Sequence, residues 1–247
     1  MTLQEAIDRR CKEKLLVSLA ARPGTTGETF YSTLFDYHGI DAEYRACRCE
    51  DIDADMALAR QHCVGISLTM PYKHRVMVDQ WMDEPLLPIN TVVVVNNILK
   101  GYNCDLRALE ELLPKIIKNK TLSVLGDGAM AQNVLHVARD NKAVIKHYSR
   151  HLGNWQHRHD AADVVINTTS LGMTQDESPL ESINADVVID CVIGDTRLIQ
   201  IARQSNKKYI SGADIYVEQF KHQFKVYTGI APDPTIVAKI AKEFFND

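Results

Sequence analysis

The sequence lacks a long apolar run and an excess of basic side chains. Its longest aliphatic run lies within Thr91–Val95, far short of the roughly 20 residues that a membrane-spanning helix needs. Lysine and arginine number 28 against 32 aspartates and glutamates, which gives a formal net charge of −4. A chain of this charge offers no basic face for a phosphate backbone. We therefore expect neither a membrane nor a nucleic acid as its partner.

Signals for secretion and for metal binding are also missing. The N-terminus has no basic region followed by an apolar stretch and a cleavage site, so the sequence predicts a cytoplasmic protein. The six cysteines include no Cys-x-x-Cys pair, which favours reduced thiols over disulfides or zinc ligands. His151, His157 and His159 have Arg158 and Asp160 as neighbours instead of ligands at metal-binding spacing. We expect this segment to be a solvated loop, and we expect no metal site.

The chain does have the composition and periodicity of an α/β protein. Hydrophobic residues make up 45% and charged residues 24%, which is enough for a sizeable core. Short β-branched runs alternate with longer amphipathic stretches, a pattern typical of parallel strands connected by helices. The pattern restarts after Cys104. We predict two α/β domains flanking a cleft, with a hinge near Asn103–Asp105 and a Rossmann-like second domain.

The expected elements follow this division. In the first part, strands are predicted at Lys14–Leu19, Ala42–Arg48, Val64–Leu68 and Thr91–Val95, and helices at Glu28–His38, Asp53–His62 and Lys73–Asp79. In the second part, strands are predicted at Leu122–Leu125, Ala143–Tyr148, Asp163–Asn167 and Asp186–Asp190, and helices at Leu106–Ile117 and Ala129–Asp140. Two further helices are expected at Ala213–Tyr227 and Asp233–Phe245.

A glycine-rich turn is the most specific motif. It follows an apolar strand and opens a helix, and it consists of Gly126, Asp127, Gly128, Ala129, Met130 and Ala131. Glycines suit a tight turn whose backbone approaches a pyrophosphate, and the helix N-terminus then holds the negative charge. This setting predicts a dinucleotide site. A close helix–strand contact is the alternative.

The end of the next strand indicates which dinucleotide. An NAD enzyme usually places a carboxylate about 20 residues after the glycine turn to bind the ribose 2′-hydroxyl. Here the strand ends at Tyr148 and continues into Ser149 and Arg150. A hydroxyl and a cation suit a 2′-phosphate, so we predict NADP. A solvent-exposed arginine after a strand is the other interpretation.

Three polar residues stand out from their surroundings. Lys73 follows a strand end and a proline turn and is expected at the start of a helix, where a cation is disfavoured by the helix dipole. Asp105 precedes a predicted helix at the hinge, where capping would be its ordinary role. Gln219 borders the apolar face of the helix 213–227. An exposed lysine in a first helical turn is the ordinary interpretation of Lys73, whereas core packing does not explain Gln219.

Together these segments resemble the shikimate dehydrogenase family. Ser67-x-Thr69-x-Pro71-x-Lys73 is similar to the family's Asn-x-Thr-x-Pro-x-Lys. The other matching segments, in chain order, are Pro88–Thr91, Gly101–Asp105, Gly126–Ala131, Ser149–His151, Asn167–Met173, Gly212–Gln219 and Tyr227–Gly229. Ordered matches along most of the chain are far more specific than any one of them.

The resemblance implies an NADP-dependent oxidoreductase of aromatic amino acid biosynthesis, in the chorismate pathway, that interconverts 3-dehydroshikimate and shikimate. It implies Lys73 as the acid/base group with Asp105, and it implies a substrate site that contains Thr25, Thr69, Asn90 and Gln219. The cofactor residues would be Gly126, Gly128, Ala129, Met130, Ala131, Ser149, Arg150, Thr168, Thr169, Ser170 and Met173. The substrate-binding and catalytic domain would cover 1–104 and 212–247, and the NADP-binding domain 105–211.

Departures from the family pattern concentrate on the substrate side. Where the family has two serines that hold the substrate carboxylate, this chain has Thr25 and Gly27, so one hydroxyl is lost or moved. Ser67 replaces the first asparagine of the lysine motif. The substrate is therefore a cyclic hydroxy acid that is either shikimate or an analogue such as quinate or aminoshikimate. A non-catalytic NADP-binding protein is a further alternative, and both monomer and homodimer fit the composition.

Overall fold

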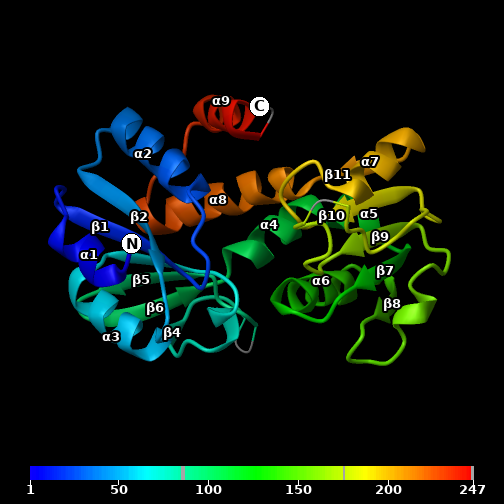
Figure 1. The fold of residues 1–247 in the computed structure, drawn as a ribbon, viewed down its shortest axis with the longest axis horizontal. Helices are drawn as coiled ribbons and strands as arrows, with labels where there is room; N and C mark the ends of the chain where they lie inside the picture. Colours follow the sequence, from blue (N-terminus) through cyan, green and yellow to red (C-terminus); the bar gives the residue numbers. More distant parts are fainter. Residues whose placement is uncertain (85–86, 175, 246–247) are drawn as a thin grey trace. The chain divides into compact units, whose positions relative to one another are not determined.

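A computed structural model describes residues 1–84, 87–174 and 176–245. The chain divides into two compact units, one made of Met1–Cys104 and Phe220–Asp247 and the other of Asp105–Gln219. Figure 1 shows a β-sheet with helices in each unit. The units divide within helix α8 (Gly212–Thr228), between Gln219 and Phe220, and not at the predicted boundary before Gly212. None of the described helices is long and apolar enough to cross a membrane.

The first unit is built on a six-stranded mixed sheet. Its strands are β1 (Lys14–Ala20), β2 (Ala42–Arg48), β3 (Gly65–Leu68), β4 (Gln80–Trp81), β5 (Thr91–Val95) and β6 (Ile98–Tyr102), in the order β2-β1-β3-β5-β6-β4. Strands β2, β1 and β3 are parallel, but β5 runs antiparallel to both β3 and β6. The expectation of an all-parallel arrangement is wrong here, because Asn96 and Asn97 adopt positive φ values of 50° and 63°. Two such residues form the tight turn of a β-hairpin.

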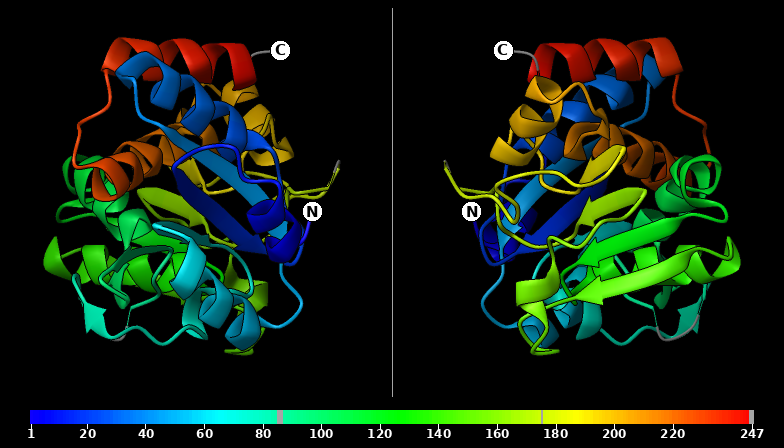
Figure 2. Two further views of the ribbon diagram at one scale, coloured as in Figure 1. Left: turned by 90° about the vertical axis from the view of Figure 1, so that its left-hand side faces the viewer. Right: turned by 90° about the vertical axis from the view of Figure 1, so that its right-hand side faces the viewer.

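Helices and a short turn complete the first unit. These elements are α1 (Leu3–Asp8), α2 (Thr26–His38), α3 (Ile52–His62), the 3₁₀ turn η1 (Tyr72–His74), the C-terminal part of α8, and α9 (Pro234–Phe245). Helices α2 and α9 lie side by side (Figure 2), and the Phe30 and Phe244 rings meet edge to face with centroids 6.1 Å apart. Leu15, Val17, Ile66 and other fully buried side chains form the core.

The helix predicted over Lys73–Asp79 is wrong. Only Tyr72–His74 turn, and the chain then runs extended toward β4. Val76 is buried and Val78 packs against the same core, two residues apart, which is the spacing of an extended segment. Leu99 N–H also donates to the Asp79 carboxylate at 2.7 Å. Pairing with β6 therefore replaces the expected helix.

The second unit is built on a five-stranded parallel sheet. Its strands are β7 (Thr121–Leu125), β8 (Val144–Tyr148), β9 (Val164–Asn167), β10 (Val187–Asp190) and β11 (Lys208–Ile210), in the order β11-β10-β9-β7-β8. Its helices are α4 (Cys104–Leu112), α5 (Pro114–Ile117), α6 (Ala129–Asp140), α7 (Arg197–Gln204) and the start of α8, with a 3₁₀ turn η2 (Trp155–His157). The single helix expected over 106–117 is interrupted because Pro114 lacks a backbone N–H.

The strand order of the second unit reverses between β7 and β9. The chain leaves β7 to form β8 on one side and then returns to form β9 on the other. In open parallel sheets, such a switch point leaves a crevice at the carboxyl ends of the strands, and ligands bind there. The predicted Rossmann-like arrangement of this unit is thus confirmed, and it directs attention to the residues that follow β7, β8 and β9.

Candidate functional site

A cavity of about 290 Å³ opens at the switch point of the second unit. It is lined by the residues that follow β7 (Gly126, Asp127), β8 (Ser149, Arg150, His151, Trp155) and β9 (Thr169, Ser170, Leu171). Five of the residues predicted to bind a cofactor share this lining: Gly126, Ser149, Arg150, Thr169 and Ser170. Three chain segments that are far apart in the sequence therefore meet at one site.

The turn after β7 requires glycine at its first position. Gly126 has a φ of 113°, and a Cβ there would lie 2.6 Å from Thr168 Oγ1. Thr168 cannot retreat freely, because its hydroxyl donates to the Leu125 carbonyl at 2.7 Å. Side chains are excluded at Gly126, so its backbone can approach a ligand closely.

The first turn of α6 has backbone N–H groups that can bind an anion. Gly128 occupies the N-cap position and provides no side-chain capping hydrogen bond. The first backbone N–H groups of a helix have no partner within the helix, so they can bind phosphate oxygens. Ala129, Met130 and Ala131 form this turn but do not line the cavity, and Ala131 is fully buried.

The loop after β8 is held in shape by Asn154. The Asn154 side chain accepts from Ser149 N–H at 3.0 Å and donates to the His147 carbonyl at 2.8 Å. Ser149 is buried, and its hydroxyl oxygen accepts from Leu152 N–H at 3.0 Å. Arg150, in contrast, is exposed at the cavity. The loop is thus fixed by polar contacts while the cation of Arg150 faces solvent.

The third wall follows β9. Asn167 is buried and accepts from both the backbone N–H and the hydroxyl of Thr169, at 3.0 and 2.7 Å. Its amide also donates to the Asp190 carboxylate at 2.9 Å. Burial raises the pKa of Asp190, while hydrogen bonds from Thr196, Val192 and Asn167 oppose that rise. Met173, also predicted to bind cofactor, is 58% exposed and lies outside the cavity lining.

Four lining residues were not predicted: Asp127, His151, Trp155 and Leu171. Asp127 lies inside the glycine motif, so its position already pointed to the cavity. His151 was assigned to a solvated loop, and it is indeed exposed, but it also lines the cavity. Trp155 follows a loop without periodicity, and nothing in the sequence pattern indicates its contact with the site.

In the first unit, the segment that contains the predicted acid/base residue Lys73 follows β3. Lys73 is half-buried in the turn η1, so the expected conflict with a helix dipole is absent, because three residues form no helix with a macrodipole. The Leu68 N–H donates to the Asn90 carbonyl at 2.8 Å, and the Ile89 N–H donates to the Lys73 carbonyl at 3.2 Å. These bonds bring together the segments of two predicted site residues, Lys73 and Asn90.

The two ends of the Asn90 side-chain amide differ in their hydrogen bonds. Its Oδ1 accepts from the Thr91 hydroxyl at 2.8 Å and from the Cys104 N–H at 2.9 Å. Within the described ranges, its Nδ2 makes no hydrogen bond and is available as a donor. Thr69 donates weakly, at 3.4 Å, to the Leu19 and Met70 carbonyls. Thr25 is exposed at the N-cap of α2 and makes no capping bond.

Two residues that depart from the family pattern, Gly27 and Ser67, both contact Tyr44. A Cβ at Gly27 would lie 2.8 Å from Tyr44 Cε1, so the Tyr44 ring occupies the space that a side chain there would need. The Tyr44 hydroxyl donates to Ser67 Oγ at 2.8 Å, and Ser67 Oγ shares a hydrogen bond of 2.9 Å with the Tyr227 hydroxyl. Burial raises the pKa of Tyr44 to about 12, so its phenol is a neutral donor.

Asp105 and Gln219 belong to the second unit. Asp105 is buried in the first turn of α4, one residue after the helix begins, and therefore does not occupy the N-cap position. Gln219 lies on α8 with an exposed fraction of 8%. Gln223, one turn later on α8, belongs to the first unit and donates to Thr91 Oγ1 at 2.7 Å.

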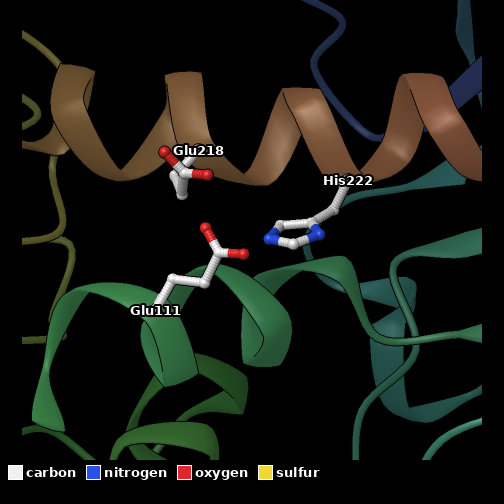
Figure 3. A group of neighbouring side chains, drawn as sticks. All are labelled: Glu111, Glu218 and His222. Carbon is white, nitrogen blue, oxygen red and sulfur yellow. The ribbon is translucent and has the colours of Figure 1, made fainter. Parts of the chain in front are cut away.

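A group of possible metal ligands lies on α4 and α8. Figure 3 shows Glu111 on α4 and Glu218 on α8, with His222 one turn beyond Glu218 on the same helix. Glu111 is exposed. Exposed acidic groups often lie close together without a metal, so we assign no ion to this group.

Comparisons with known proteins agree with this geometry. No family model matches the chain. A shikimate dehydrogenase-like protein from Haemophilus influenzae is 29% identical over 260 residues, which cover 92% of this chain and 95% of the relative. A shikimate dehydrogenase (NADP(+)) from Pyrobaculum islandicum is 24% identical over 263 residues, which cover 94% of this chain and 98% of the relative.

A solved structure gives the same result. The structure of a shikimate 5-dehydrogenase-like protein, 29% identical, superposes with a TM-score of 0.80 and covers 92% of this chain and 96% of its own. Sequence similarity and fold therefore agree over nearly the whole length. The chain is thus similar to shikimate dehydrogenase-like proteins in both sequence and fold.

Proposed function

We propose that this protein is an NADP-dependent oxidoreductase that interconverts 3-dehydroshikimate and shikimate, or a close analogue, by hydride transfer. Curated relatives are named NADP(+)-dependent shikimate dehydrogenases. The observation that carries the proposal is the cavity after β7, β8 and β9, where an obligatory glycine turn faces the cation of Arg150. The same family places the enzyme in aromatic amino acid biosynthesis.

The residues of the cavity fit an NADP molecule. The turn at Gly126 excludes a side chain, and the uncapped start of α6 presents backbone N–H groups to a pyrophosphate. Arg150 supplies a cation for the 2′-phosphate, and Ser149 precedes it. The carboxylate that would hold a free 2′-hydroxyl is absent after β8, where the chain reads Ser149 and Arg150. These features support NADP as the cofactor.

Lys73 is the proposed acid/base group. When bound, NADPH supplies a hydride to the substrate ketone. The ketone oxygen then gains negative charge, which an ammonium stabilises and to which it can transfer a proton. Asp105 is the proposed partner that keeps the ammonium oriented. Thr25, Thr69, Asn90 and Gln219 are proposed to bind the substrate, with Asn90 donating from its free Nδ2.

Quinate and aminoshikimate remain alternative substrates. The observation that favours them is the Tyr44 ring beside Gly27, with its hydroxyl on Ser67. Both contacts lie where this chain departs from the family pattern. A change in the groups that recognise the substrate alters specificity without altering the hydride chemistry. A protein that binds NADP without turnover is the non-catalytic alternative, and the presence of both Lys73 and Asp105 argues against it.

The state of the cysteines supports a proposal for the cellular location of the protein. The six cysteines are free thiols, and none forms a disulfide. Burial raises the pKa of Cys47, Cys49 and Cys63 to about 12, so these thiols are unreactive. Free, inert thiols agree with a reducing compartment such as the cytoplasm. The proposed assembly is a monomer or a homodimer.

The decisive experiment follows the NADPH absorbance with purified protein and 3-dehydroshikimate. The reverse reaction is run with shikimate, quinate and aminoshikimate, with NADP and NAD in parallel. Saturable NADP-linked turnover of shikimate is the expected result. Faster turnover of quinate or aminoshikimate would favour the alternative substrates. Tight NADPH binding with no turnover of any of these acids would contradict the proposed enzyme.

A further inference from the structure

Trp155, which no sequence motif singles out, lies between the core of the second unit and the cofactor cavity. Its indole packs against the cluster that includes Leu125, Tyr148 and Val165, and it also lines the cavity beside Arg150. The Arg150 guanidinium carbon lies 5.9 Å from the centroid of the Trp155 ring. This distance is within the range of a cation–π contact.

A second arginine holds the indole in place. The Arg158 guanidinium carbon lies 4.9 Å from the Trp155 ring centroid. Arg158 is itself fixed, because its Nε donates to the Pro179 carbonyl at 2.8 Å and its Nη1 to the Trp155 carbonyl at 3.1 Å. The ring that Arg150 meets is therefore a rigid surface.

Arg150 differs in its partner from arginines of this chain that pair with carboxylates. Arg60 pairs with Asp79 at 2.9 Å, and Arg203 pairs with Asp195 at 3.0 Å. Among the residues that the structure describes, Arg150 forms no ion pair with a carboxylate. A carboxylate would orient the guanidinium but would also cancel its charge. An aromatic face orients it and leaves the charge available to an anion.

We infer that Trp155 is a positioning residue for NADP specificity: its indole holds the Arg150 guanidinium toward the cavity with its charge uncompensated, ready for the 2′-phosphate. This inference rests on the proposed NADP-dependent function and names the group that sets its cofactor preference. Trp155 acts through Arg150. Its effect is therefore confined to the cofactor that carries a 2′-phosphate, and NADH binding does not depend on it.

The test measures the dissociation constants of NADPH and NADH for Trp155→Leu and Trp155→Phe by nucleotide fluorescence. Trp155→Leu should lower the preference for NADPH over NADH about two- to fivefold, the effect of one exposed cation–π contact. Trp155→Phe keeps an aromatic face and should retain most of the preference. Trp81→Leu is the matched control, because Trp81 is the other tryptophan and lies in the first unit. It should leave both constants unchanged.

A double-mutant cycle that combines Trp155→Leu with Arg150→Ala distinguishes a positioning role of Trp155 from a packing role. Arg150→Ala alone should lower the preference about tenfold or more, as expected for a lost charge-assisted hydrogen bond. In that background, Trp155→Leu should have no further effect on the preference. Equal weakening of NADPH and NADH by Trp155→Leu would overturn the inference, because it would indicate a purely structural role. The inference would also be overturned if Trp155→Leu lowered the preference for NADPH as much in the Arg150→Ala background as it does alone.

Failure of the proposed function has a different signature. If the unmodified protein binds NADPH no better than NADH, and Arg150→Ala changes neither constant, the NADP assignment fails, and the role of Trp155 with it. If Arg150→Ala abolishes the preference while Trp155→Leu preserves it, only the role of Trp155 is wrong.

Discussion

The Tyr44 hydroxyl donates a 2.8 Å hydrogen bond to Ser67 Oγ, from a ring that fills the space beside Gly27. Tyr44 is also stacked on Tyr31, with ring centroids 4.2 Å apart. The ring is therefore fixed on one side by Tyr31 and at its end by Ser67. Glycine at position 27 and serine at position 67 are thus parts of one arrangement centred on a tyrosine.

Gly27→Ala should destabilise the protein despite its place in a helix. Gly27 lies in the first turn of α2, where alanine is intrinsically better by up to about 1 kcal/mol. The added Cβ, however, would lie 2.8 Å from a ring atom of Tyr44 that has no room to move. Overpacking of this kind costs about 1–3 kcal/mol, so the clash should win. Urea unfolding of the variant measures the difference.

Gly24→Ala is the control for that measurement, because a Cβ at Gly24 meets no atom within 4 Å. The clash should also disappear when Tyr44 is replaced. In a Tyr44→Leu background, Gly27→Ala should cost less than it does alone, which a double-mutant cycle detects. Equal costs in both backgrounds would mean that Tyr44 does not occupy this space.

Tyr44→Phe should alter the stability at alkaline pH. Burial raises the pKa of Tyr44 to about 12, above its ordinary value of 10.0. Between these values the unfolded chain loses the phenolic proton and the folded chain keeps it. The contribution of the protonated Tyr44 phenol to the free energy of unfolding is fully present below pH 10. It falls by about 2 to 3 kcal/mol as pH rises through 12.

The variant lacks this ionisation. Its free energy of unfolding should fall less steeply than that of the unmodified protein above pH 10, although at pH 7 it should be lower by about 1 kcal/mol for the lost hydrogen bond. Urea titrations from pH 7 to 11 measure both. Parallel curves above pH 10 would show that Tyr44 ionises normally in the folded state.

Strands and helices with a clear period were predictable from the sequence. Strands β1, β2, β5 and helix α6 lie where periodicity placed them. Strand β6 was not predicted, although Asn96 and Asn97 before it favour a hairpin turn and the hinge predicted near Asn103–Asp105 follows directly after it. Helix α7 is eight residues long, and its N-cap is Thr196, whose hydroxyl accepts from Ile199 N–H. A helix this short gives a weak periodic signal.

The candidate site shows the same limit. Gly126 and Arg150 were predictable because each has a fixed place relative to a strand end. Trp155 was not, since its contact with Arg150 depends on the loop shape that Asn154 maintains through two hydrogen bonds. The Tyr44–Ser67 hydrogen bond joins two residues that are 23 positions apart in the sequence, and the register of the sheet brings them together. Sequence spacing cannot report such contacts.

Asp127→Asn should strengthen the binding of both NADPH and NADH. Asp127 is exposed and lines the cavity, so its carboxylate repels the cofactor phosphates. At about 8 Å in water, one such repulsion corresponds to about a two- to threefold change in affinity, and salt screens it. Fluorescence titrations at low and high salt measure the effect. Asp186→Asn, at an exposed position before β10, should change neither constant. A loss of affinity in Asp127→Asn would show that this carboxylate binds the cofactor instead.

Lys73→Met should abolish most turnover while cofactor binding survives. The proposed proton transfer contributes about 10²–10⁴-fold to the rate, and methionine keeps the length of the side chain without its charge. Lys73 lies in the first unit, whereas the cavity lining lies entirely in the second, so the NADPH dissociation constant should be unchanged.

The variant also has an internal electrostatic check. Burial, and then the Lys73 charge, lower the pKa of His74 from 6.5. Removing that charge should raise the pKa of His74 without restoring 6.5, because burial remains, and NMR titration of the imidazole measures it. Normal turnover with a raised His74 pKa would show that the charge was removed and that Lys73 is not the acid/base group.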